Sequence, residues 1–241
     1  MAFRVVIPAR YHSTRLPGKA LLAIAGKPMI QWVHERARQS GASEVIVATD
    51  DERIAQAAKS FGATVAMTAA SHVSGTDRIA EVARTGRWAG TDIVVNVQGD
   101  EPLIAPALIS RVAGLLEKPS DASVSTACHA IHDPQALASP NVVKVVLDAR
   151  GYALYFSRSQ IPHPRQEGGT WYRHAGIYGY RVGFLKRYSA LPPSPLEATE
   201  ALEQLRVLWH GYRIAVAVSE SAVPPGVDTP QDLEAVRRMI R

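Results

Sequence analysis

The sequence predicts an α/β fold in which helices cover both faces of a mostly parallel sheet. Short apolar segments bounded by turn residues alternate with helical patterns through the first half of the chain. The segment 92–97, DIVVNV, is apolar nearly throughout, which is typical of a strand buried on both faces. Sheets of this kind bind ligands beyond the carboxyl ends of their strands.

Each element predicted in the first half rests on a short apolar run or a helical period. In chain order we expect a strand at 3–8, a helix from about 28 to 39, a strand at 44–48, a helix from 51, a strand at 64–67, a helix from about 76, a strand at 92–97 and a helix from about 106. Ser74, followed three residues later by Asp77, resembles a capping box at the third helix.

The alternation changes after about residue 120. There we expect strands at 142–147, 152–156 and 176–180, a helix at about 196–209, a strand at 213–218 and a helix at 230–240. We therefore predict one structural unit of two lobes. Residues 1–120 form the main lobe, residues 121–212 form a smaller mixed α/β lobe, and residues 213–241 return to the main lobe.

The composition restricts the class of protein. The 241 residues suffice for one large domain or two small ones. No apolar run approaches the roughly 20 residues needed to span a bilayer, and the first apolar stretch stops at Pro8, unlike a signal peptide. The single cysteine, Cys128, excludes an internal disulfide framework and a Cys-rich zinc site. We therefore expect a cytoplasmic chain that does not insert into membranes.

The net charge of +5 has three possible causes, which are nucleic acid, a small anionic substrate and solubility. The basic residues are spread along the chain, and the densest group, Arg237, Arg238 and Arg241, lies in the last helical turns, where cations suit the helix dipole. The sequence has no basic tail and no zinc-finger spacing. A small anion is favoured, and no nucleic-acid partner is expected.

Three cations lie in one loop directly after the first predicted strand. The stretch IPARYHSTRLPGKAL contains Arg10, Arg15 and Lys19. It matches neither the Walker loop nor the G-x-G-x-x-G pattern. Its guanidinium forks, ammonium and hydroxyls nevertheless suit phosphate oxygens. A solvated surface loop turned by Pro17 explains the same residues equally well.

Two acidic turns add to this loop. Asp100 lies in VQGDEP, at the carboxyl end of the strand at 92–97, and Asp228 lies in PGVDTP, before the last helix. Mg²⁺ takes oxygen ligands of this kind together with substrate phosphates. The structural alternatives are a turn at Asp100 and a helix cap at Asp228 or Thr229, with Pro230 in the first helical position. Together the three stretches indicate metal-assisted phosphoryl or nucleotidyl chemistry.

Nine stretches carry a recognisable pattern in a fixed order. They are IPARYHSTRLPGKAL, VATDDERI, SGTDRIAE, VVNVQGDEPLI, PNVVKVV, ALYFSRSQIP, HAGIYGYR, LEQLRVLWHG and PGVDTPQDL. In this order they resemble the family of 3-deoxy-manno-octulosonate (Kdo) cytidylyltransferases, also called CMP-Kdo synthetases. The resemblance covers residues 7–233. Sialic-acid cytidylyltransferases share the fold and a related first loop that ends differently.

The resemblance implies a Rossmann-like sheet of the nucleotidyltransferase, GT-A-like kind. It implies that the main lobe binds the nucleotide and that the smaller lobe binds the sugar and forms a homodimer. The implied reaction joins CTP and Kdo to CMP-Kdo and releases pyrophosphate, with Mg²⁺, for lipopolysaccharide biosynthesis. The anomeric hydroxyl attacks the α-phosphate, so positioning and charge neutralisation should dominate catalysis.

The resemblance also implies a nucleotide site. Its residues would be Arg10, Ser13, Arg15 and Lys19 for the triphosphate, and Ser74, Gly75 and Arg78 for the cytosine and ribose. Asp100 and Asp228 would bind Mg²⁺. These two carboxylates form the implied catalytic set together with Arg10 and Lys19.

A sugar site is implied as well. Its residues would be Gln98, Arg158, His174, Tyr178, Glu200, Glu203 and Gln204. Arg158 would meet the sugar carboxylate through its guanidinium fork. Glu200, Glu203 and Gln204 are spaced to share one face of the expected helix. The opposite face, expected to meet the core, carries Ala198, Leu202, Leu205 and Trp209. Periodicity alone predicts that the polar face contacts water. The resemblance implies that it contacts the sugar.

Several alternatives stay open. His174 also fits a half-buried strand histidine, and the stretch 158–173 is long enough to form a lid. The substrate could be another acid sugar, such as 8-amino-Kdo or a sialic acid. A regulator that binds CTP without turnover is disfavoured, because a binder would not need two metal carboxylates. The charge alone suggests a nucleic-acid module, whose binding would depend steeply on salt.

Overall fold

The computed structural model describes residues 2–13, 16–72, 74–117, 121–166 and 168–240. Its strands are β1 (Phe3–Ala9), β2 (Ala23–Ile24), β3 (Lys27–Pro28), β4 (Glu44–Thr49), β5 (Thr64–Met67), β6 (Ile93–Asn96), β7 (Ala122–Ile131), β8 (Lys144–Leu147), β9 (Ala153–Ser157), β10 (Trp171–Arg181) and β11 (Arg213–Ser219). Its helices are the 3₁₀ helix η1 (Lys19–Leu21) and α1 (Met29–Arg38), α2 (Glu52–Ser60), α3 (Gly75–Thr85), α4 (Pro106–Glu117), α5 (Pro134–Ala138), α6 (Val182–Tyr188), α7 (Pro195–Glu200), α8 (Gln204–Trp209) and α9 (Pro230–Met239). No helix among these residues has the length and apolar character needed to cross a membrane.

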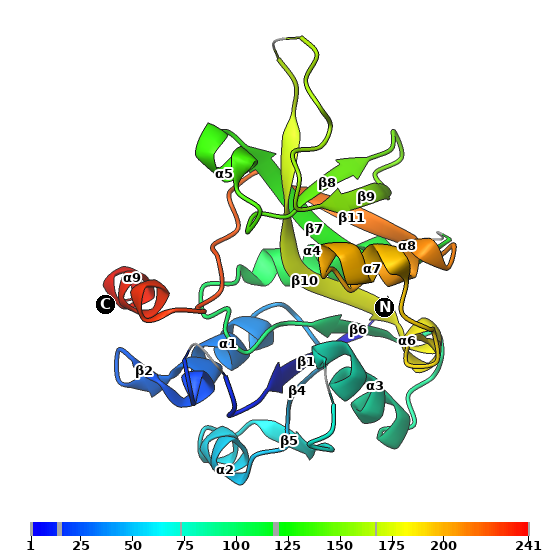
Figure 1. Ribbon diagram of the computed structural model, residues 1–241. Helices are drawn as coiled ribbons and strands as arrows, with labels where there is room; N and C mark the ends of the chain where they lie inside the picture. The colour runs from blue at the N-terminus through cyan, green and yellow to red at the C-terminus, as the bar shows by residue number, and fades with distance from the viewer. Residues whose placement is uncertain (1, 14–15, 73, 118–120, 167, 241) are drawn as a thin grey trace.

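Among the described residues, β2 and β3 form a small two-stranded sheet, and the other nine strands form one mixed sheet. Its order is β11-β7-β10-β6-β1-β4-β5, and β8 and β9 attach beside β10 (Figure 1). Strands β6, β1, β4 and β5 run parallel, which confirms the predicted parallel half. Strand β10 is antiparallel to β6 and β7, whereas β11 is parallel to β7.

Helices cover both faces of the sheet, and the alternation of side chains along β1 divides the apolar residues between two cores. Val5 and Ile7 pack in the core of α1, α2 and α4 on one face. Val6 packs in the core of α3, α6 and α8 on the other face. All three side chains are fully buried, and each such burial contributes about 1.5–3 kcal/mol. The core therefore fixes the point at which the cationic loop begins.

Strand direction reverses in the middle of the sheet, at β6. This strand is parallel to β1 but antiparallel to β10, so Asn96 at its carboxyl end stands opposite Tyr178. The register of β10 against β7 shifts between Ala175 and Tyr178, which bends the strand. A Cβ on Gly176 would lie 3.6 Å from Oε1 of Glu101. The turn after β6 and the bend of β10 therefore lie side by side.

The predicted helix caps are present. The Ser74 side chain accepts a hydrogen bond from the Asp77 amide at 3.1 Å and donates to Oδ2 of Asp77 at 2.9 Å, so Ser74 caps the helix but does not form the capping box that its spacing suggested. Thr229 caps α9 in a capping box with Asp232, and proline occupies the next position. Of the two caps considered for α9, the structure uses Thr229, and Asp228 contacts Lys19 instead.

Two strand expectations in the second half are wrong. Strand β7 lies between β10 and β11, where the sequence pattern predicts no strand. Its sequence, ASVSTACHAI, is rich in small and polar residues and shows no apolar run that marks a strand. Strand β10 begins at Trp171 rather than near 176, so the irregular stretch after β9 is shorter than expected.

The single helix expected at 196–209 is also wrong. Ala201 ends α7 in the left-handed conformation, with φ of 51°, which the right-handed helix excludes. Helix α8 then starts in a new direction. Leu202 is buried as expected, but Ala198 is exposed and 53% of the Trp209 surface is accessible. The expected core-facing stripe therefore does not exist.

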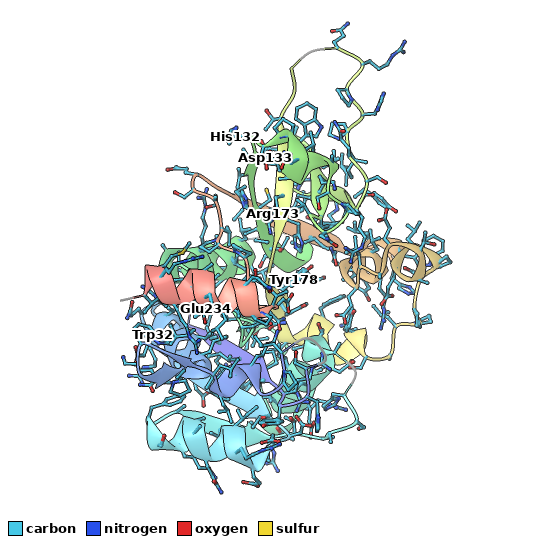
Figure 2. The ribbon with its side chains drawn as sticks, turned by 60° about the vertical axis from the view of Figure 1, so that its left-hand side comes forward. Trp32, His132, Asp133, Arg173, Tyr178 and Glu234 are labelled. Carbon is cyan, nitrogen blue, oxygen red and sulfur yellow. The ribbon has the colours of Figure 1, made fainter. Side chains whose placement is uncertain are left out.

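Segments assigned to both predicted lobes share the sheet. Strand β10 pairs with β6 of the parallel half and with β7, whereas β8, β9, α5 and the first half of β10 extend away from the parallel half (Figure 1). Helix α9 returns to the amino-terminal elements, where Leu233 packs with Ile24 and Met29. Figure 2 labels Trp32 of α1 and Glu234 of α9 on this side of the molecule. The lobe boundaries at 120 and 212 stay a prediction.

Candidate functional site

A polar hollow opens at the carboxyl ends of β1 and β6. It spans about 440 Å³, including space open to solvent, and is lined by Pro8, Ala9, Arg10, Lys19, Ala20, Gln98, Gly99 and Asp100. A Cβ at position 99 would lie only 3.0 Å from the carbonyl oxygen of Pro8, so glycine lets this turn approach β1 closely. The cationic loop and the first acidic turn therefore meet where open α/β sheets bind their ligands.

Lys19 joins both acidic turns. Its Nζ donates hydrogen bonds to Asp100 and, at 3.1 Å, to Oδ1 of Asp228. The Val227 amide donates to the Asp100 carbonyl at 2.8 Å, which attaches the second turn to the first. Burial lowers the pKa of Lys19, but the two carboxylates outweigh this effect and raise the pKa above its ordinary value. The predicted meeting of loop and turns is present.

The two carboxylates fit a magnesium ion. Both carboxylates contact the ammonium of Lys19. A cation at that position is therefore stabilised by both of them. The described residues contain no group of three or more His, Cys, Asp or Glu side chains able to hold a metal. Mg²⁺ needs no such cage, because it is commonly held by one or two carboxylates together with substrate phosphates.

A second hollow of about 300 Å³ adjoins the first and shares Arg10 and Gln98 with it. Ser74, Gly75 and Arg78, predicted as nucleoside contacts, line it together with His72, Pro8 and Ala9. Arg78 is only 4% exposed. Its guanidinium contacts Oδ1 of Asp50 at 3.0 Å and donates to the hydroxyl of Thr68, so its position is fixed before any ligand arrives.

Two further residues, Ser13 and Arg15, were predicted to bind the triphosphate. Arg15 lies outside the described residues. Ser13 is half-buried in the cationic loop, next to that gap. Arg10 is exposed and lines both hollows. Its guanidinium can therefore reach a ligand in either hollow.

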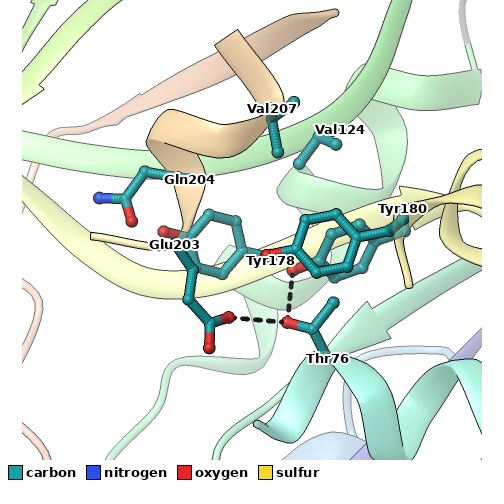
Figure 3. Close-up of a pocket in the computed structure, with 8 residues that line it drawn as sticks. Thr76, Val124, Tyr178, Tyr180, Glu203, Gln204 and Val207 are labelled. Carbon is teal, nitrogen blue, oxygen red and sulfur yellow. Dashed lines mark hydrogen bonds between the residues drawn. The ribbon is translucent and has the colours of Figure 1, made fainter. Parts of the chain in front are cut away.

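A third, narrow hollow lies between α3, β10 and α8 and spans about 240 Å³ when the solvent space at its mouth is included. It is lined by Thr76, Val124, Tyr178, Tyr180, Tyr188, Glu203, Gln204 and Val207 (Figure 3). Thr76 Oγ1 donates to Oε2 of Glu203 at 3.3 Å and lies 3.5 Å from the Tyr180 hydroxyl. Burial raises the pKa of Glu203, and the hydrogen bond from Thr76 opposes this rise. Three predicted sugar residues, Tyr178, Glu203 and Gln204, are therefore brought together.

His174 lies beside this group on β10. Its Nε2 is 3.0 Å from Oγ1 of Thr126, and its ring centroid is 5.3 Å from that of Tyr178 and 5.0 Å from that of Phe156. Burial lowers the pKa of His174 to about 3, so the imidazole is neutral at physiological pH. This matches the half-buried strand histidine considered above, and a contact with sugar stays a prediction.

Glu200 and Arg158 form a separate pair. The Glu200 carboxylate accepts hydrogen bonds from Oγ of Ser157 at 2.6 Å and from the Arg158 amide at 2.9 Å. Because Ala201 breaks the helix, Glu200 belongs to α7 and Gln204 to α8. The expectation that Glu200, Glu203 and Gln204 share one helical face is therefore wrong.

Sequence analysis did not single out Thr76 or Glu101, and both lie at the site. Oε2 of Glu101 is buried and has no hydrogen-bond partner among the described residues. Burial, and then the neighbouring Asp100, raise the pKa of Glu101 to about 8. Two adjacent carboxylates at the end of a buried strand are a signal for such a shift. No comparable signal marks Thr76, whose partner lies 127 positions away.

Comparison with known proteins agrees with this geometry. The cytidylyltransferase family matches residues 4–214. The chain is 56% identical to the 3-deoxy-manno-octulosonate cytidylyltransferase of Tolumonas auensis, over 100% of this chain and 97% of the relative. It is 55% identical to the protein of the same name from Vibrio cholerae serotype O1, over 100% and 98%.

Solved structures give the same result. A CMP:2-keto-3-deoxy-manno-octonic acid synthetase complexed with CTP superposes with a TM-score of 0.94 and 48% identity, over 99% of this chain and 98% of that one. A cytidylyltransferase from Leptospira borgpetersenii, at 21% identity over 98% and 85%, shares the fold with a TM-score of 0.66. The nucleotidyltransferase fold is confirmed, and the chain belongs to the cytidylyltransferase family, among the 3-deoxy-manno-octulosonate cytidylyltransferases.

Proposed function

We propose that this enzyme transfers the cytidylyl group of CTP to the anomeric hydroxyl of Kdo and releases pyrophosphate. The observation that carries the proposal is the convergence of Lys19, Asp100 and Asp228 beside a basic hollow. A relative 48% identical in sequence, described as bound to CTP, has nearly the same backbone. The product would serve lipopolysaccharide biosynthesis.

The nucleotide would occupy the two adjoining hollows. Arg10 and Lys19 would neutralise the triphosphate, and the same charges would stabilise the departing pyrophosphate. Ser74, Gly75 and the fixed guanidinium of Arg78 would contact the nucleoside, since they line the hollow that Arg10 connects to the first. Binding both ends of CTP in this way aligns the α-phosphorus for attack.

Asp100 and Asp228 would hold Mg²⁺. The ion, when bound, neutralises phosphate charge and favours ionisation of the attacking hydroxyl. Lys19 contacts both carboxylates in the protein alone, so its ammonium holds them close together before the ion arrives. The same ammonium is then available to phosphate oxygens.

The sugar would bind between Arg158 and the third hollow. Three of the five guanidinium N–H groups of Arg158 donate to the carbonyls of Glu200, Pro140 and Ala201. The remaining two suit a carboxylate. Hydroxyl contacts would come from Gln98, His174, Tyr178, Glu203 and Gln204. Glu200 would act through Ser157 and the Arg158 amide, which its oxygens already contact.

The direct test is pyrophosphate release from CTP and Mg²⁺, measured in parallel with Kdo, 8-amino-Kdo and N-acetylneuraminate. We expect release with Kdo. Release with another sugar but not with Kdo would support the cytidylyl transfer and contradict Kdo as the substrate. No release with any sugar, together with measurable CTP binding, would overturn the enzyme and favour a regulator.

Replacing Thr76 by Val is expected to raise KM for the sugar about ten-fold while leaving KM for CTP nearly unchanged. The reason is the lost hydrogen bond to Glu203, since bonds to charged groups contribute about 1.5–3 kcal/mol. Steady-state kinetics with each substrate varied in turn would measure the effect. Thr76→Ser should restore the sugar KM.

A control for this substitution lies on the same helix. Within the part of the chain that the structure describes, the Thr85 hydroxyl donates to carbonyls of its own helix alone, at 3.1 Å, so Thr85→Val should change neither KM. An equal rise of both KM values in Thr76→Val would contradict a role at the sugar.

We further propose that the enzyme is a cytoplasmic homodimer without nucleic-acid partners. Support for self-association comes from two large apolar side chains on the surface, Leu154 of β9 and Trp209 of α8, which are 59% and 53% exposed. Sedimentation of the purified chain should give twice the monomer mass, and sedimentation as a monomer would contradict the proposal.

A further inference from the structure

Lys144 at the start of β8 is completely buried, which is rare for a lysine. Its Nζ donates to the carbonyls of Ser139 at 2.9 Å and Val142 at 2.6 Å, and to the carbonyl of Arg158. An ammonium has three N–H donors, whereas a neutral amine has two. Three carbonyl acceptors therefore require the charged form.

Among the described residues, no carboxylate forms an ion pair with the Lys144 ammonium. All three hydrogen-bond acceptors are uncharged backbone groups, and the charged groups that act on the ammonium are Glu200 and Arg158. Burial lowers the pKa of Lys144, and Glu200 opposes the decrease. A buried cation costs stability unless nearby charge offsets it, and an uncharged side chain could fill the same space.

Lys144 and Arg158 hold the same turn. Lys144 bonds the carbonyls of residues 139 and 142, and Nη1 of Arg158 bonds the carbonyl of Pro140 at 3.0 Å. Lys144 also bonds the Arg158 carbonyl, and Nε of Arg158 bonds the Glu200 carbonyl at 2.7 Å. The two cations therefore form one framework with the end of α7, and Lys144 fixes the backbone that carries Arg158.

The charges of this framework do not balance. It contains two cations and one carboxylate, Glu200, whose oxygens are bonded to Ser157 and to the Arg158 amide. One positive charge is therefore in excess, next to a guanidinium with two N–H groups that bond to none of the described residues. A ligand with one carboxylate group would neutralise the excess positive charge and accept hydrogen bonds from the two N–H groups of Arg158.

We propose that Lys144 is a positioning residue for the carboxylate of the sugar. It fixes Arg158 through the backbone and adds a second positive charge, without contacting the ligand. The inference rests on the proposed function, because the ligand that supplies the carboxylate is the acid sugar. It assigns Lys144 an effect on sugar binding and none on CTP, whose predicted residues lie in the other two hollows.

The test is kinetic and uses Lys144→Gln, which keeps two N–H donors and removes the charge. We expect KM for the sugar to rise about ten-fold, KM for CTP to stay within about two-fold, and kcat to change little. Lys144→Met, which also removes the donors, should raise the sugar KM further. Lys186→Gln is the matched control, since Lys186 on α6 donates to a single carbonyl, that of Trp88, at 2.7 Å; both KM values should stay unchanged.

The outcomes separate this inference from the proposed function. An unchanged sugar KM in Lys144→Gln, with an active wild-type enzyme, overturns the inference alone. A parallel rise of both KM values, or failure of both variants to fold, also overturns it, because Lys144 is then only structural. If the wild-type protein converts none of the three acid sugars, the proposed function fails, and this inference fails with it.

Discussion

Replacing Asp100 by Asn is expected to reduce turnover at least about a thousand-fold, because the change removes a carboxylate proposed to hold Mg²⁺ and keeps the size of the side chain. Lys19 retains its bond to Asp228 at 3.1 Å, so the turns should stay together. Pyrophosphate release would measure the loss, and the melting temperature should stay close to that of the wild-type protein.

A surface aspartate provides the control for this experiment. Asp121 is 53% exposed and pairs with Arg213 at 3.0 Å, and exposed pairs of this kind contribute little. Asp121→Asn should therefore keep full activity. Near-normal turnover in Asp100→Asn at saturating Mg²⁺ would exclude the carboxylate from the mechanism and leave Asp228 as the main metal ligand.

The second large effect is expected on stability. Replacing Arg78 by Met should lower the free energy of unfolding by about 3 kcal/mol, because it removes the partner of the partly buried Asp50 carboxylate. For a chain of this size the melting temperature should fall by roughly 6–12 °C. Calorimetry would measure the decrease. KM for CTP should rise in the same variant, since Arg78 lines the second hollow.

A second substitution separates charge from packing. In the double variant Arg78→Met, Asp50→Asn, the unpaired charge is absent, so part of the lost stability should return. KM for CTP should stay high, because the guanidinium is still missing. A double variant no more stable than the single one would show that Arg78 stabilises the fold through packing rather than through Asp50.

The amino-acid sequence predicts the parallel half of the sheet well, because β1, β4, β5 and β6 are short apolar runs with turn residues on both sides. It fails at β7, whose small and polar residues are held in a strand by two neighbouring strands. It also fails at Ala201, where one left-handed residue divides the expected helix. In both places tertiary contacts, rather than local pattern, determine the structure.

The same distinction applies to the site. Lys19, Asp100 and Asp228 are predictable, because each lies in a turn of recognisable sequence near the end of a strand or before a helix. The roles of Thr76 and Lys144 depend on partners that local sequence does not mark, such as Glu203. The two carboxylate oxygens of Glu200 likewise accept hydrogen bonds from Ser157 and the Arg158 amide, which are distant from it in the sequence.

The position of Lys19 makes the proposed site depend on residues that are synthesised at very different times. Its ammonium joins a carboxylate 81 positions away to another 209 positions away. A nascent chain on the ribosome therefore carries the cationic loop and Asp100 long before Asp228 is made. Helix α9, which packs on elements near the amino terminus, must also emerge. A chain that stops short of Asp228 lacks the second of the two carboxylates proposed to hold Mg²⁺, so we expect it not to consume CTP.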